Sequence, residues 1–154
     1  MKKLLMSFWY AFCGLWYCIK NERNFRIHIY AAITVLSVLH RYSLSSARMA
    51  IIFMTIASVL VCEGFNTAIE QLANTVTDEE RQSIKICKDV SAASVLISAA
   101  MAVAVAWSIL WDTKILGGLI VEIFSSPLKT MGLIIYIIAG VIFIFLPERK
   151  KKNV

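Results

Sequence analysis

Charged side chains are scarce in this sequence. Asp, Glu, Lys and Arg make up 17% of its 154 residues, whereas 59% are hydrophobic. A soluble domain of this length would bury one core and carry more charge on its surface. The composition therefore favours a protein whose helices lie in a membrane.

Familiar nucleotide and metal motifs are also missing. The chain has no GxxxxGK[ST] loop and no GxGxxG segment after a strand, which excludes the common nucleotide-binding folds. Its four cysteines form no CxxC pair and no Cys/His cluster with zinc spacing. We interpret them as reduced, apolar packing residues.

The net charge of +6 is not gathered into one basic patch. The basic residues come in blocks between apolar runs, a pattern that suits membrane topology better than nucleic-acid binding. We predict no nucleic-acid partner.

The apolar runs predict an all-α membrane protein. Residues 4–19 are rich in aromatic side chains and flanked by lysines, and we expect them to form an amphipathic helix on the bilayer surface. We expect three core transmembrane helices and a fourth C-terminal span, from residues 29–39, 47–73, 90–111 and 131–146. The first run must extend into its flanks, since a crossing needs roughly 20 residues.

Two connections separate these spans. Residues 74–88 are polar, and Thr77 or Asp78 is suited to cap a short helical turn there. Residues 112–129 are expected to form an external loop. With four crossings and the N-terminus inside, 12 of the 16 basic residues face the cytoplasm, which predicts that both termini are cytoplasmic.

The stretch CEGFNTAIEQL, residues 62–72, places polar side chains at the inner end of the second span. Glu63, Asn66 and Glu70 fall at positions i, i+3 and i+7, so they share one face of a helix. An ionised carboxylate near hydrocarbon is unfavourable by several kcal/mol. A lone Glu63 could be a structural partner of a neighbouring side chain, but the whole set indicates a function.

Three more polar residues reach the same membrane surface. Glu22 follows the surface helix, and Lys88 and Asp89 open the third span. Several carboxylates without a cationic partner favour Mg²⁺, and a lysine beside them suits phosphate oxygens. A carboxylate nearer the lipid can take a proton from an alcohol. This combination indicates phosphoryl transfer to a membrane alcohol.

These residues match the pattern of a known family. CEGFNTAIEQL followed by KICKDVSAASVL resembles the small prokaryotic diacylglycerol kinase and undecaprenol kinase family, whose core pattern is E-x-x-N-[ST]-A-I-E and then K-D. GLWYCIKNERNFRIH resembles the family's surface helix and first metal carboxylate, and NFRIH resembles the undecaprenol kinase branch. The resemblance covers residues 8–111.

The resemblance implies a lipid kinase in the cell membrane with its active site at the cytoplasmic face. Such an enzyme uses ATP and Mg²⁺ to phosphorylate a lipid alcohol, here undecaprenol or otherwise diacylglycerol. It also implies a homotrimer of three-span subunits whose active sites are shared between chains. Residues 1–111 then form the kinase core, and residues 112–154 add the external loop, an extra span and a basic cytoplasmic tail.

The resemblance also implies a role for each matching residue. Glu63 corresponds to the general base, Glu22 and Glu70 correspond to the metal carboxylates, and the nucleotide contacts correspond to Asn66, Lys88 and Asp89, with Tyr10 a weaker match. The chain departs from the pattern at Asn74, where an aspartate is common, and at Arg81, where a histidine often occurs. Both differences concern nucleotide selectivity.

Two other readings remain open. A small four-span transporter could use Glu63 to couple protons to export, since such proteins also carry a charged residue in a helix bundle. It would not need the other polar residues at one water-facing end. A degenerate kinase acting only as a structural subunit is disfavoured, because the core residues are intact.

Overall fold

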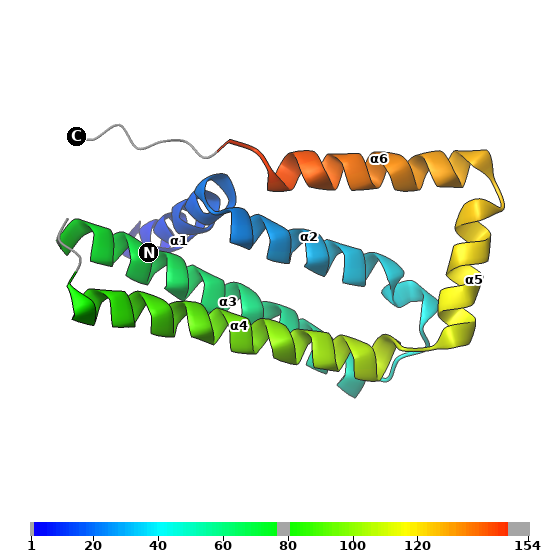
Figure 1. Cartoon of the computed structure of the whole chain (residues 1–154), viewed down its shortest axis with the longest axis horizontal. Coiled ribbons are helices and arrows are strands. Elements are labelled where there is room, and N and C mark those ends of the chain that lie inside the picture. The colour runs from blue at the N-terminus through cyan, green and yellow to red at the C-terminus, as the bar shows by residue number, and fades with distance from the viewer. Residues whose placement is uncertain (1, 77–80, 148–154) are drawn as a thin grey trace.

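The computed structural model describes residues 2–76 and 81–147, and every regular element in these ranges is a helix (Figure 1). In chain order the elements are α1 (Lys2–Asn21), α2 (Arg23–Val38), the 3-10 helix η1 (Leu39–Arg41), α3 (Ser46–Val76), α4 (Gln82–Leu110), α5 (Thr113–Phe124) and α6 (Pro127–Ile144). The all-α prediction is confirmed.

Three helices of the described residues are long and apolar enough to cross a bilayer. They comprise residues Ser46–Thr75, Gln82–Leu110 and Pro127–Ile144. The prediction of four spans therefore exceeds the three that qualify. The missing one is α2, whose 16 residues extend about 24 Å, less than the roughly 30 Å of a hydrocarbon core.

The α3–α4 hairpin extends further than the apolar runs indicated. Residues 74–88 were expected to be a polar connection, but α3 continues to Val76 and α4 already begins at Gln82. The polar ends stay helical because the two helices bond across the hairpin, with Lys88 Nζ donating to Asn74 Oδ1 at 3.2 Å. The proposed caps Thr77 and Asp78 lie outside the described residues.

The expected loop at residues 112–129 is also wrong, because it contains α5 and the start of α6. The Asp112 carboxylate caps α5 by accepting from the backbone N–H groups of Lys114 (2.9 Å) and Ile115 (3.1 Å). Pro127 occupies the first turn of α6, where its missing N–H costs no helical hydrogen bond.

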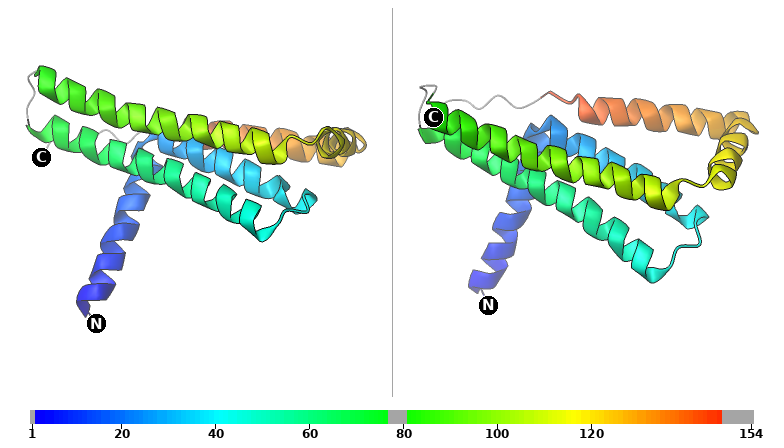
Figure 2. Two further views of the ribbon diagram at one scale, coloured as in Figure 1. Left: turned by 90° about the horizontal axis from the view of Figure 1, so that it is seen from below. Right: turned by 60° about the horizontal axis from the view of Figure 1, so that its bottom comes forward.

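Helix α1 projects away from the other helices (Figure 2). Its large side chains are exposed along most of its length, including Phe8, Trp9 and Trp16 at 58%, 66% and 57%. Cys18, near its end, is buried where α1 meets α2 and α3. Only the end of α1 is therefore held by this chain.

Helix α6 runs along α2 on the side away from the α3–α4 hairpin (Figure 1). The ring of Tyr30 stacks on that of Tyr136, with centroids 5.0 Å apart. The Tyr136 hydroxyl also shares a 2.7 Å hydrogen bond with Thr34 Oγ1. Gly140 faces the Tyr30 ring so closely that an added Cβ would overlap it. A glycine at this position lets the two helices approach.

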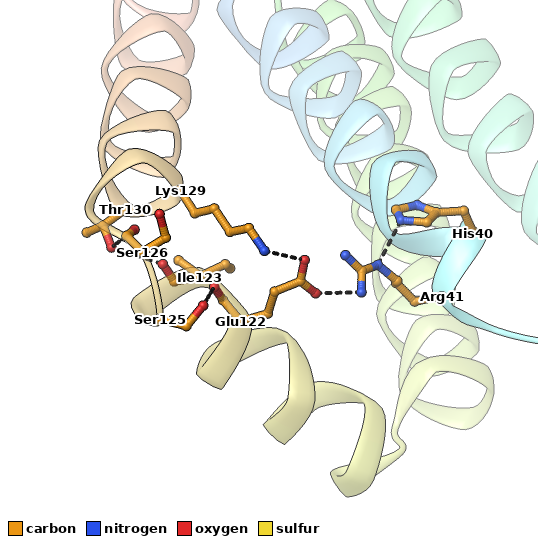
Figure 3. A network of polar contacts seen from close by, with 8 residues as sticks. All are labelled: His40, Arg41, Glu122, Ile123, Ser125, Ser126, Lys129 and Thr130. Atoms are coloured by element: carbon orange, nitrogen blue, oxygen red, sulfur yellow. Dashed lines mark hydrogen bonds and ion pairs between the residues drawn. The ribbon is translucent and has the colours of Figure 1, made fainter.

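An ionic cluster joins η1, α5 and α6 at the opposite end of the molecule from α1 (Figure 3). Glu122 pairs with Arg41 at 2.5 Å and with Lys129 at 2.9 Å. Arg41 Nε donates to His40 Nε2 at 2.8 Å. The two cations hold the pKa of the Glu122 carboxyl at about 2, chiefly through the hydrogen bond from Arg41.

Candidate active site

The C-terminal half of α3 carries a polar face that is largely buried. Glu63, Asn66 and Thr67 are only 2%, 7% and 4% exposed, and Glu70 follows on the same face in a half-buried position. The prediction that the two glutamates and the asparagine share one helix face is confirmed. Burying them costs free energy unless they are hydrogen-bonded or serve a ligand.

Asn66 is oriented by a residue that the sequence analysis missed. Ser91 of α4, 6% exposed, donates from its hydroxyl to Asn66 Oδ1 at 2.7 Å. The Asn66 amide nitrogen then faces Glu70 Oε1 at 3.5 Å. Ser91 follows the K-D pair among several small residues, so its spacing from Lys88 was the only signal for it.

The pair Lys88–Asp89 lies beside this face on α4. Lys88 is half-buried and its ammonium group contacts Asn74, one of the two positions that depart from the family pattern. Asp89 is exposed. The structure thus places the predicted lysine at the same end of the hairpin as Asn66 and Glu70.

Glu63 lacks a hydrogen bond that a buried carboxylate normally has. Its Oε2 atom has no partner among residues 2–76 and 81–147, and the same is true of the neighbouring Thr67 hydroxyl. Such buried, unsatisfied oxygens are rare in folded proteins and often mark a catalytic or ligand-binding group. Glu63 is therefore free to accept a proton or a hydrogen bond from a ligand.

The corner between α1 and α2 carries Glu22. Glu22 precedes α2 with an extended backbone and is half-buried. Burial raises the pKa of the nearby Cys18 thiol, and the negative charges of Glu22 and Glu63 raise it further, while Thr67 opposes the shift. Both α1 and α2 contact α3, the helix that carries Glu63.

The predicted roles of Tyr10 and of a metal ion stay predictions. Tyr10 is 63% exposed and lies eight residues, about 12 Å along the helix axis, before Cys18. The described part of the chain also holds no group of three or more His, Cys, Asp or Glu side chains placed to bind a metal ion.

A cavity of about 320 Å³ opens between α2, α3 and α4. Its lining is mainly apolar and runs from Val59 and Leu60, one turn before Glu63, to Leu110 at the end of α4. His28 and Thr55 are its polar side chains. A hydrocarbon chain fits this lining, since ligand sites of this kind are mostly apolar with few polar groups.

Arg26 was also missed, although its side chain is only 1% exposed. It lies one turn after Glu22, and its guanidinium binds four backbone carbonyls, two in the last turn of α1 and two at or just beyond the end of α6. A buried cation of this kind is costly unless it is fully hydrogen-bonded. The sequence showed it only as one more basic residue at the membrane surface.

Comparison with known proteins assigns the chain to a family. The model of the family described as prokaryotic diacylglycerol kinase matches residues 9–110. A diacylglycerol kinase of Synechocystis sp. is 36% identical over 103 residues, which are 66% of this chain and 59% of that protein. The undecaprenol kinase of Bacillus subtilis is 34% identical over 99 residues, or 64% of this chain and 80% of that protein.

The chain thus spans about three fifths of the length of the cyanobacterial relative. No solved structure matches. The matched region contains every polar residue of the site on α3 and α4, together with the α1–α2 corner. The chain therefore belongs to the prokaryotic diacylglycerol kinase family, a family of membrane lipid kinases.

Proposed function

We propose that this protein transfers the γ-phosphate of ATP to the hydroxyl of a membrane lipid alcohol, undecaprenol in the first place and diacylglycerol otherwise. The observation that carries the proposal is the buried Glu63, whose Oε2 lacks a partner in the described chain next to an apolar cavity. We place undecaprenol first because the NFRIH stretch, residues 24–28, resembles the undecaprenol kinase branch. The two relatives, at 36% and 34% identity, bear one substrate name each.

Glu63 acts as the general base in this reaction. The lipid hydroxyl oxygen attacks the γ-phosphorus, and its proton passes to Glu63 Oε2 as the new P–O bond forms. The bond between the γ-phosphorus and the bridging oxygen breaks, and ADP leaves with the electron pair. The apolar cavity holds the hydrocarbon chain of the lipid. The lipid hydroxyl then reaches Glu63, which lies one helical turn beyond the lining residues Val59 and Leu60.

The remaining polar residues bind magnesium and the nucleotide. Glu22 and Glu70 supply hard carboxylate oxygens, and two such ligands suffice for Mg²⁺ because it usually keeps waters and substrate phosphates. When bound, the ion neutralises charge on the phosphates. Asn66, Lys88 and Asp89 contact the nucleotide around its phosphates. The Lys88 ammonium supplies positive charge there, and the Asn66 amide is held in place by Ser91. The exposed Tyr10 reaches a nucleotide only in a neighbouring subunit.

Assembly into a homotrimer with shared active sites agrees with the exposed surface of this chain. The apolar window of α4 is 0% buried within the chain, which leaves room for neighbouring helices as well as lipid. Tyr10 is exposed on α1, which projects away from the other helices, and this exposure also agrees with a neighbouring subunit at that position. Residues 1–111 make the kinase core, and residues 112–154 are the addition to it.

Four crossings with both termini in the cytoplasm remain our proposed topology. The 16 residues of α2 and the three of η1 together extend about 30 Å, at about 1.5 Å and 2.0 Å per residue, and this length equals that of the hydrocarbon core. The active site then lies at the cytoplasmic face, and the cluster around Glu122 lies outside. The aromatic part of α1 lies on the inner surface of the bilayer.

The test is lipid phosphorylation by purified protein in mixed micelles that contain undecaprenol or diacylglycerol. We expect ATP-dependent product with undecaprenol at the higher rate, and no product in excess chelator. Absence of product with both lipids would exclude the kinase activity, and full activity in chelator would exclude the metal.

The buried, unpartnered Glu63 also supports a second candidate, a small proton-coupled transporter. The same protein in sealed vesicles would then carry protons across the membrane without ATP, and Glu63→Gln would stop the flux. Lipid phosphorylation without proton flux excludes this candidate.

A further inference from the structure

Arg26 joins the ends of two helices that lie far apart in the sequence. Its Nη1 atom donates to the carbonyls of Ile19 (3.2 Å) and Lys20 (3.0 Å), in the last turn of α1. Its Nε and Nη2 atoms donate to the carbonyls of Ile144 (3.1 Å) and Leu146 (3.0 Å), at the end of α6. The last carbonyls of a helix lack helical partners and carry partial negative charge, so one buried cation satisfies both ends.

This junction lies at the corner that carries Glu22. Arg26 follows Glu22 by four residues, or about one turn of α2. Cys18, in the last turn of α1, is buried at the same corner. The contacts of Arg26 therefore determine how α1 leaves α2 and where Glu22 is held.

Half of this support comes from outside the family region. The family match ends at residue 110, whereas Ile144 and Leu146 belong to the C-terminal addition. Removing these two carbonyls would leave the buried guanidinium with two of its four acceptors. An incompletely bonded buried charge is costly, so the corner would open to let water reach it.

Three further contacts hold α6 in register on α2. Gly140 lies against the Tyr30 ring, and Tyr136 stacks on the same ring. Beyond the end of α6, the guanidinium of Arg23 lies over the ring of Phe145, 5.9 Å from the ring centroid. This register places the carbonyls at the end of α6 within hydrogen-bond distance of Arg26.

We propose that α6 braces the active-site corner through Arg26, which acts as a positioning residue for Glu22. The role of Glu22 in binding Mg–ATP rests on the proposed function. The brace itself does not, because it is a statement about which helix keeps the corner closed. A helix that merely faces lipid would leave the corner unchanged when it is displaced.

The variant Gly140→Leu displaces α6, because its side chain has no room beside Tyr30. Gly132→Leu is the matched control, since Gly132 lies on the same helix and an added Cβ there meets nothing within 4 Å. Both are made in a background that keeps Cys18 as the sole cysteine. The rate at which a membrane-permeant maleimide labels Cys18 reports the opening of the corner without any reference to activity.

We expect Gly140→Leu to raise the Cys18 labelling rate on the order of tenfold, as for a local opening made easier, and Gly132→Leu to leave it unchanged. Arg26→Lys keeps a cation but loses the four-point contact, so it should raise the rate by a smaller factor. This second variant carries the test if Gly140→Leu does not fold. Parental labelling rates in both variants would overturn the brace.

Kinetics test the link to Glu22. In Gly140→Leu we expect the KM for Mg–ATP to rise about 3- to 10-fold, while kcat at saturating nucleotide stays within about twofold. A faster labelling rate with an unchanged KM would overturn the positioning of Glu22. If the parent protein phosphorylates no lipid but its Cys18 labelling follows the pattern above, the proposed function fails and the brace stands.

Discussion

At the scale of a residue, two glutamates on the same face of α3 show how position decides chemistry. Glu63 is 2% exposed and has an oxygen without a partner in the described chain. Glu70 is half-buried, lies about two turns closer to the hairpin end, and faces the amide of Asn66. The deeper carboxylate suits a lipid hydroxyl, and the outer one suits a metal–nucleotide complex arriving from water.

Replacing the two carboxylates should therefore have different effects on turnover and on nucleotide affinity. Glu63→Gln keeps the size and removes the base, so turnover should fall by a factor of about 10² to 10⁴ with little change in nucleotide affinity. Glu70→Gln removes a metal ligand, so Mg–ATP binding should weaken together with turnover. Turnover and nucleotide affinity are measured for each variant at saturating lipid. Loss of ATP affinity in Glu63→Gln alone would invert the two roles.

Ser91 offers a second test at this scale. Ser91→Ala leaves Asn66 Oδ1 buried without its 2.7 Å donor, so kcat/KM for Mg–ATP should fall roughly tenfold, in line with the loss of a buried hydrogen bond. Ser94→Ala on the same helix is the control, because the Ser94 hydroxyl is exposed and bonds only to the Val90 carbonyl. Ser91→Thr keeps the hydroxyl and should recover part of the loss. Equal effects of the two alanine variants would refute the orienting role.

At the scale of an element, α5 is joined to its neighbours by the carboxylate of one residue, Glu122. Its Glu122 binds Arg41 of η1 and Lys129 of α6, so it connects the family-matched part of the chain to the C-terminal residues that follow it (Figure 3). These cations stabilise the ionised form, which is why the pKa of the carboxyl falls from 4.5 to about 2. A depressed folded-state pKa contributes stability above the unfolded pKa and loses it as the pH falls toward the folded value.

The contact between α5 and η1 should therefore survive mild acid. Spin labels at Ser43 and Lys114, two exposed positions, should keep their separation from pH 7 down to about pH 4. The separation should spread between pH 4 and pH 2, as Glu122 takes up a proton. In Glu122→Gln the broad distribution should already be present at pH 7 and should not change with pH. A separation that changes near pH 6 would indicate another titrating group.

At the scale of the whole molecule, the arrangement of charge along the helices predicts its orientation in the membrane. The polar residues of α3 and α4 gather at one end of the hairpin, and the ionic cluster around Glu122 lies at the other. The four-crossing topology divides the 16 basic residues 12 to 4 between the two sides, so we expect the end with Glu63 to face the cytoplasm.

Single cysteines introduced into a cysteine-free chain test this orientation. Lys114→Cys should react with a membrane-impermeant maleimide in intact cells, whereas Ser83→Cys should react only after the cells are opened. Both positions are exposed, so a lack of reaction does not reflect burial. Reaction of both in intact cells would contradict a crossing by α4, and reaction of Ser83→Cys alone would contradict the proposed orientation.

The sequence by itself determined the helical class, the family and the polar face of α3. Hydrophobic runs and the positions of Glu63, Asn66 and Glu70 are local properties, because a helix places residues three, four and seven apart on one side whatever surrounds it. The prediction from the same hydrophobic runs was wrong about the ends of the α3–α4 hairpin, and it did not include α5. Helix length beyond an apolar run depends on caps and neighbours, such as Asp112, rather than on hydrophobicity.

Only the tertiary structure decided which distant groups meet. The hydroxyl of Ser91 reaches Asn66 from another helix, and the guanidinium of Arg26 collects carbonyls at a separation of about 120 residues along the chain. Backbone carbonyls look alike in every sequence, so no pattern marks the four that bind Arg26. The coupling of α6 to the corner of Glu22 therefore follows from packing, which places the end of one helix beside the buried cation of another.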